Sequence, residues 1–109
     1  MKNALVIVLM GVICWTFGAW AEEGETLFKS NRCGACHKPD TGRTHPSLKN
    51  ISQAYQGKED QLVRYLNGEA DPIINPEKAG IMKRHIEKTK ALSDADRKSL
   101  ADFLMRHSN

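Results

Sequence analysis

The sequence predicts a small all-α domain built from four helices. Four segments place apolar residues at helical spacing, and no segment shows the strict alternation of apolar and polar residues that marks a strand. The chain has 109 residues, which is enough for one domain, and it contains no internal repeat, low-complexity tract or linker. We therefore expect one compact helical domain.

The N-terminal segment is predicted to be a signal peptide and not part of that domain. Lys2 gives a positive start, residues 4–18 are almost entirely apolar, and Ala19-Trp20-Ala21 carries small residues where a signal peptidase cleaves. Removal of residues 1–21 would leave residues 22–109 as the domain. An uncleaved membrane anchor is the alternative, because the apolar run is close to the shortest that can span a bilayer.

The first two expected helices cover residues 24–31 and 48–55. Gly57 follows the second as a stop signal. Each helix has an apolar face, formed in the first by Leu27 and Phe28 and in the second by Leu48, Ile51 and Tyr55.

The third expected helix covers residues 59–67, with Gly68 just past its end, and the fourth begins at Ser93. Ser93 and Asp96 resemble a capping box, in which the first side chain accepts a hydrogen bond from the backbone three residues on. The apolar faces are formed by Leu62, Val63 and Leu66 in the third helix and by Leu100, Ala101, Phe103 and Leu104 in the fourth.

A domain of this size needs help to form a stable core. So short a chain buries only about 60% of the surface that its unfolded form exposes. Cys33 and Cys36 are the two cysteines of the expected domain, and they are too close together to staple distant parts of it. We expect a large apolar cofactor to complete the core.

Cys33-Gly34-Ala35-Cys36-His37 is a C-x-x-C-H motif, the attachment signal for haem c. Residues three or four apart lie on the same side of a helical turn. Cys33 and Cys36 can therefore both reach the vinyl groups on one edge of the porphyrin, and His37 can place its imidazole under the iron. The motif predicts one covalently bound haem with His37 as an iron ligand.

Three kinds of site other than haem attachment can also use two cysteines that are close together in the sequence. A disulfide between Cys33 and Cys36 would close too small a loop to stabilise much. A thioredoxin-like redox pair needs a preceding strand, which is not expected here. A zinc site would require one of the isolated histidines His45, His85 or His107 as a further ligand.

Together, the motif after a short helix, Pro46-Ser47-Leu48, Met82 in a loop and a final amphipathic helix resemble a small bacterial class I cytochrome c with one haem. The resemblance covers residues 22–107. It implies a cytochrome c-like domain wrapped around the haem, with the first and last helices crossing near Phe28 and Phe103. It also implies a periplasmic protein that carries single electrons between redox partners of a respiratory or photosynthetic chain.

The resemblance also implies roles for residues around the haem. The Pro46 carbonyl should accept the Nδ1 proton of His37, which orients the ring and strengthens its donation to iron. Leu48 should help to enclose the haem. His45 occupies a position where the family usually has glycine, and we expect its imidazole to face solvent at the rim of the haem pocket.

Residues 69–92 form a segment of a different kind, expected to be irregular until about Lys78 because Pro72, Pro76 and Gly80 interrupt it. The side chains that could close the sixth iron position are Met82, Met105, His45, His85 and His107. Met105 falls inside the final helix, where methionine usually fills space, and His107 is close to the chain end. Met82, in the irregular segment, is the expected ligand.

An iron atom with both His37 and Met82 as ligands has no free position for a substrate, so we expect an electron carrier and not an enzyme. The alternatives are a haem-based gas sensor, in which Met82 leaves the iron, and an electron-transfer subunit of a larger oxidoreductase. The formal net charge of +3 does not indicate a nucleic-acid partner. Five basic residues at positions 78–90 predict brief docking of a monomer to acidic redox partners.

Overall fold

The structure is a computed structural model that describes residues 17–42 and 44–108, and it is helical throughout its regular elements. Within these residues it contains no strand, so the predicted all-α class is confirmed. In chain order the elements are α1 (Phe17–Ser30), η1 (Cys33–Ala35), α2 (Leu48–Ala54), α3 (Glu59–Leu66), η2 (Pro76–Lys78), α4 (Ala79–Lys90) and α5 (Asp94–Leu104).

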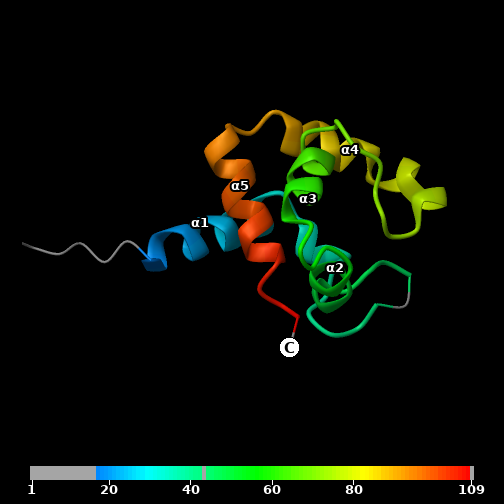
Figure 1. The fold of residues 1–109 in the computed structure, drawn as a ribbon, viewed down its shortest axis with the longest axis horizontal. Helices are drawn as coiled ribbons and strands as arrows, with labels where there is room; N and C mark the ends of the chain where they lie inside the picture. The colour runs from blue at the N-terminus through cyan, green and yellow to red at the C-terminus, as the bar shows by residue number, and fades with distance from the viewer. Residues whose placement is uncertain (1–16, 43, 109) are drawn as a thin grey trace, which may run out of the picture.

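The crossing of α1 and α5 is the most extensive helix contact and is visible in Figure 1. The rings of Phe28 and Phe103 meet there with centroids 5.2 Å apart, as the resemblance implied. Gly24 permits the close approach, because a Cβ atom at this position would lie 2.7 Å from Phe103 Cβ and would also collide with the Ser99 carbonyl oxygen. This crossing supports one end of the core.

Helix α1 begins earlier than expected, at Phe17 instead of Gly24. Its additional residues include alanines and glutamates, which are good helix formers. The predicted signal peptide falls largely on residues 1–16, which lie outside the described residues, and its cleavage after Ala21 stays a prediction. Over the described part of the chain, no helix combines the length and the apolar character needed to cross a membrane.

The helix ends follow their sequence signals. Ser47 forms a reciprocal capping box with Asn50 at the start of α2, and the Ser93 hydroxyl accepts a 3.1 Å hydrogen bond from the Asp96 amide. At the end of α3, Gly68 has a φ of +72°. The Gly68 and Glu69 amides donate to carbonyls of the last turn, which is a Schellman motif. These contacts fix the starts of α2 and α5 and the end of α3.

Helix α4 is the main departure from the expected fold. The chain is irregular up to η2, as predicted, but Met82 lies in the first turns of α4 and not in a loop, so the described residues form five α-helices instead of four. Gly80 does not stop this helix. It lies in the first turn, where few contacts of the helix depend on the side chain that glycine lacks. The polar residues of α4 are mostly good helix formers, and Ile86 packs against the core.

Candidate haem site

An apolar cleft opens in the middle of the domain and is bordered by residues of every α-helix. Its empty space is about 970 Å³ when the open mouth is counted. Its apolar walls include Phe28, Ile51, Leu62, Leu66, Ile74 and Leu100. A smaller cavity shares one wall with the cleft and reaches Cys36.

Two residues of the C-x-x-C-H motif, Cys33 and His37, lie on the wall that the two cavities share. Arg32 turns the chain with a φ of 58°, η1 follows, and the His37 amide donates a 2.9 Å hydrogen bond to the Cys33 carbonyl. Cys33 and Cys36 are both free thiols, and Cys33 is half-buried while Cys36 is exposed. Burial raises the pKa of the Cys33 thiol, and nearby Lys88 slightly opposes this shift.

The imidazole of His37 is held by the chain that returns toward α2. Its Nδ1 lies 2.7 Å from the Pro46 carbonyl oxygen, as the resemblance implied. A carbonyl can only accept, so Nδ1 carries the proton and the Nε2 lone pair is free for a metal. Burial lowers the pKa of His37, the hydrogen bond to Pro46 opposes this, and His45 and His85 add smaller lowering contributions. The ring is therefore held in one orientation, with Nε2 free to bind a metal.

His45 lies beside His37 and does not simply face solvent. Its ring is half-buried, with its centroid 6.2 Å from that of His37, and it lines both cavities. The expectation of a solvent-facing imidazole is therefore wrong in part. The bulky ring turns inward over the edge of the His37 imidazole, where the larger cavity leaves room for it.

The structure separates the five candidates for the sixth iron ligand into two groups. Met82, His85 and His45 line both cavities, whereas the described residues Met105 and His107 line neither. Met105 packs against the core, and the His107 ring meets the Phe103 ring with centroids 5.0 Å apart.

Pro46 also lines the larger cavity, but the described side chain of Leu48 does not. Leu48 is buried in the core, and its amide donates a 2.8 Å hydrogen bond to the Lys38 carbonyl. It supports the chain next to His37, and its expected part in enclosing the haem stays a prediction.

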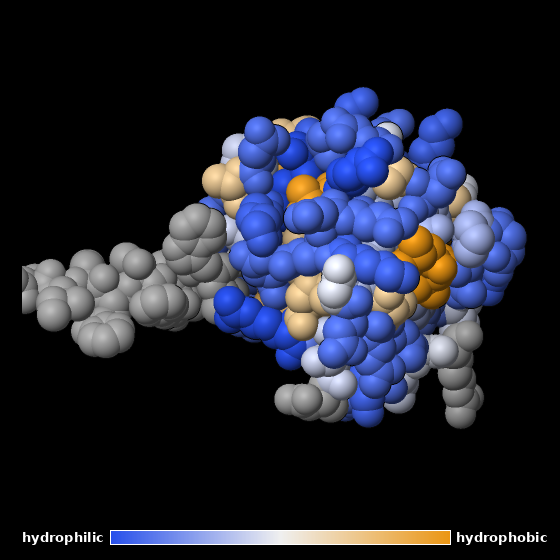
Figure 2. Space-filling model, viewed as in Figure 1, coloured by the Kyte–Doolittle hydropathy of each residue, from blue (hydrophilic) through white to orange (hydrophobic). Residues whose placement is uncertain are grey.

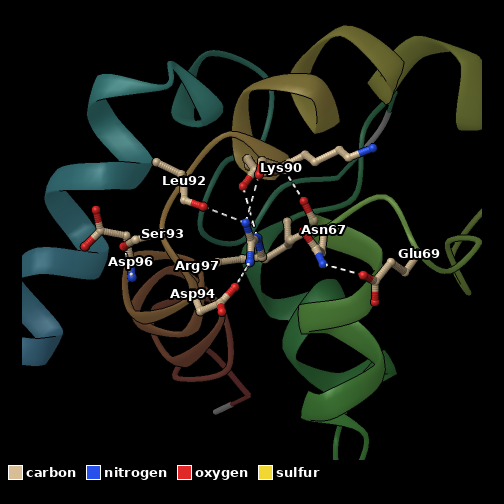
Figure 3. A network of polar contacts seen from close by, with 10 residues as sticks. Asn67, Glu69, Lys90, Leu92, Ser93, Asp94, Asp96 and Arg97 are labelled. Atoms are coloured by element: carbon tan, nitrogen blue, oxygen red, sulfur yellow. Dashed lines mark hydrogen bonds and ion pairs between the residues drawn. The ribbon is translucent and has the colours of Figure 1, made fainter.

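Arg97 fixes the C-terminal end of α4, a role that the sequence did not indicate (Figure 3). Its side chain is buried, and the residue is only 4% exposed. The guanidinium donates to the carbonyls of Thr89, Lys90 and Leu92 at 3.1, 2.8 and 2.6 Å and pairs with Asp94. The Thr89 hydroxyl donates a 2.6 Å hydrogen bond to the Leu66 carbonyl. Helix α4 is thus tied to both α3 and α5.

These residues fit a covalently attached haem. The cleft is apolar, the free thiol of Cys33 lines it and that of Cys36 lines the adjoining smaller cavity, and an imidazole with an available Nε2 lies next to them. No aspartate or glutamate is found among the described residues that line the cleft, so no ring of carboxylates opposes an apolar cofactor.

The comparisons with known proteins agree with this chemistry. The cytochrome c family model matches residues 21–108. A cytochrome c-551 from Stutzerimonas stutzeri is 36% identical over 70% of this chain and 77% of its own length. A cytochrome c-553 from Nitratidesulfovibrio vulgaris is 31% identical over 97% and 99% of the two chains. A cytochrome c-551 from Pseudomonas aeruginosa is 34% identical over a match that covers 54% of this chain and 60% of that relative.

The predicted resemblance to small bacterial cytochromes c is therefore confirmed, and with it covalently bound haem c as the cofactor. The family carries covalently bound haem c, and its iron serves in electron transfer. The chain belongs to the cytochrome c family.

Proposed function

We propose that this protein is a monomeric electron carrier of the bacterial periplasm, which moves one electron at a time between two redox proteins. The observation that carries the proposal is that His37 and Met82 line the same apolar cleft beside the two attachment cysteines. The haem would supply an iron atom that accepts and returns one electron. Residues 1–21 would direct export and would then be removed.

The side chains around the cleft would hold the haem and set its reduction potential. Cys33 and Cys36 would attach it, His37 Nε2 and the Met82 sulphur would be the axial ligands, and Pro46 would fix the His37 ring. Ligation by histidine and methionine raises the reduction potential relative to two histidines. An apolar wall acts in the same direction, because it disfavours the additional positive charge of the ferric state. Two protein ligands would leave no position for a substrate, which supports a carrier over an enzyme.

The surface next to the cleft suits brief docking to an acidic partner. Hydrophilic side chains cover most of the face seen in Figure 2. Ile81 lines the cleft and is 56% exposed, and the exposed residues Lys83 and Arg84 border a shallow cavity beside it. Lys88 is close enough to Cys33 to affect the pKa of its thiol. Exposed charges of this kind speed encounter without tight binding.

The test is the bimolecular rate of electron transfer to an acidic redox protein as ionic strength rises. We expect the rate to fall with salt, because exposed charges are screened over about 10 Å at 0.1 M. Lys83→Glu with Lys88→Glu should slow the reaction at low salt and leave the spectrum unchanged. Lys29→Glu with Lys58→Glu makes the same change in charge at exposed residues that line none of the described cavities, and it should have a smaller effect. An electron-transfer rate that changes neither with salt nor with the Lys83 and Lys88 replacements would contradict the docking proposal.

A further inference from the structure

We propose that His85 is a reserve iron ligand, which closes the sixth position whenever Met82 leaves it. The inference rests on the proposed function, in which Met82 is the ligand of the resting protein. It adds a second ligation state to the same haem and so a second reduction potential.

Helical geometry places Met82 and His85 on the same face of α4. Residues three apart on a helix are neighbours, with Cβ atoms about 5–6 Å apart. Both side chains are half-buried and line both cavities. Two side chains able to bind iron therefore face one space from neighbouring positions.

The two ligands are anchored unequally. Met82 lies in the first turn of α4, which follows η2 directly, and Lys78 at the N-cap provides no side-chain cap. His85 lies one turn closer to Thr89, which is secured to α3 through the Leu66 carbonyl and to α5 through Arg97. Helix ends without caps fray first. Fraying of the first turn would withdraw Met82, while His85, one turn further on, remains in the cleft.

His85 is also chemically suited to this position. Neutral imidazole is a good ligand for haem iron, as His37 is proposed to be on the other side. The exchange would replace a thioether by an imidazole and would lower the reduction potential, because a pair of histidines favours the ferric state relative to histidine and methionine. The protein would thus have a high-potential and a low-potential form.

His45 supplies a matched control, since it is a third half-buried histidine that lines both cavities. Its ring lies beside His37, and it comes from the segment that carries Pro46, not from α4. This position is on the side of the proposed proximal ligand. His45 should therefore be unable to replace Met82, although its chemistry is the same as that of His85.

The experiment compares haem-loaded wild type, Met82→Ala, Met82→Ala/His85→Ala and Met82→Ala/His45→Ala. The readouts are the optical spectrum, carbon monoxide binding and the reduction potential. We expect the wild type to show the sulphur-to-iron charge-transfer band. Met82→Ala should lose this band, remain six-coordinate and low-spin, have a lower potential and exclude carbon monoxide. Removing His85 in addition should give a five-coordinate iron that binds carbon monoxide, and removing His45 should not.

The possible failures are distinguishable. Two results would overturn the reserve ligand while the Met82 assignment stands, provided that the wild type has the band. One is that Met82→Ala already binds carbon monoxide. The other is that Met82→Ala/His85→Ala still excludes carbon monoxide. If the wild type lacks the band and Met82→Ala does not change its spectrum, the Met82 assignment itself is wrong, and the inference falls with it. Should Met82→Ala/His85→Ala fail to fold, Met82→Ala/His85→Leu retains apolar volume and must give the same five-coordinate spectrum.

Discussion

The Nδ1 atom of His37 lies 2.7 Å from the carbonyl oxygen of Pro46, nine residues further along the chain. This contact sets the tautomer of the ring, because the carbonyl can only accept a hydrogen bond and Nδ1 must therefore carry the proton. It leaves Nε2 available on a ring that burial keeps neutral by lowering its pKa. A ligand oriented before the metal arrives loses less freedom on binding it.

Met82 and Met105 are predicted to respond oppositely to substitution. Met82→Ala should erase the charge-transfer band from sulphur to iron, because the thioether is the proposed axial ligand. Met105→Leu should leave the spectrum unchanged and cost less than about 1.5 kcal/mol of stability, since it is a volume-conserving swap in the core. Optical spectra and chemical unfolding of the haem-loaded variants measure both effects. Loss of the band in Met105→Leu alone would show that the wrong methionine was assigned.

Arg97→Met is predicted to destabilise the domain. The substitution removes the guanidinium donor from the carbonyls of Thr89, Lys90 and Leu92. Thr89 keeps the Leu92 amide as a donor, but each buried group left unsatisfied costs about 1–3 kcal/mol. Asp94 is exposed and is solvated without its partner. The neighbouring Lys98→Met removes only partly exposed ion pairs and should cost about 1 kcal/mol or less. Equal unfolding free energies for the two variants would contradict the anchoring role of Arg97.

Gly24→Ala and Gly80→Ala are predicted to change stability in opposite directions. A Cβ atom at Gly24 would collide with α5, so the helices must separate, at a cost of about 1–3 kcal/mol. A Cβ atom at Gly80 would meet nothing within 4 Å, and alanine is the better helix former by up to about 1 kcal/mol. Thermal unfolding of both variants tests the α1–α5 crossing. A Gly24→Ala protein as stable as the wild type would mean that the crossing is looser than described.

Glu59→Gln is predicted to alter the pH dependence of stability. The pKa of Glu59 is raised above its ordinary value of 4.5, chiefly by its hydrogen bond with Asp102. The folded protein therefore retains a proton that the unfolded chain releases, and this contribution is lost as pH rises through the raised pKa. The pKa of Asp102 is lowered, so its own contribution is lost as pH falls.

The amide that Glu59→Gln introduces can donate to Asp102 at every pH. The variant should therefore lose less stability than the wild type as pH rises from about 4.5, the ordinary value for Glu59. Unfolding free energies across this range give the comparison, and Asp60→Asn, which removes an exposed carboxylate next to Glu59, is the control. Identical slopes for Glu59→Gln and the wild type would show that the carboxyl pair is not coupled to folding.

Local signals in the sequence predicted much of this fold. Ser93 and Gly68 act within a few residues of their own positions, at the start of α5 and just past the end of α3. The C-x-x-C-H motif is local in the same sense, because its spacing alone brings its side chains together. Features of this kind do not depend on the remainder of the chain.

The parts that the sequence did not reveal depend on distant partners. Pro72, Pro76 and Gly80 suggested an irregular segment around Met82, but helix α4 is held in place from its other end by Arg97 and Thr89. In the sequence, a buried arginine cannot be distinguished from an ordinary surface charge. Gly24 likewise has no local signature, because its function is set by α5.

Attachment of haem through Cys33 and Cys36 is the central claim, and denaturing electrophoresis with haem staining tests it most directly. The protein is produced in cells with a cytochrome c maturation system, boiled and separated, and the mass of the stained band is measured. We expect the stain to persist on the wild-type chain, with the added mass of one haem, and to disappear in Cys33→Ala/Cys36→Ala. A wild-type chain that releases all of its haem into acidic acetone, or that carries none, would contradict the account.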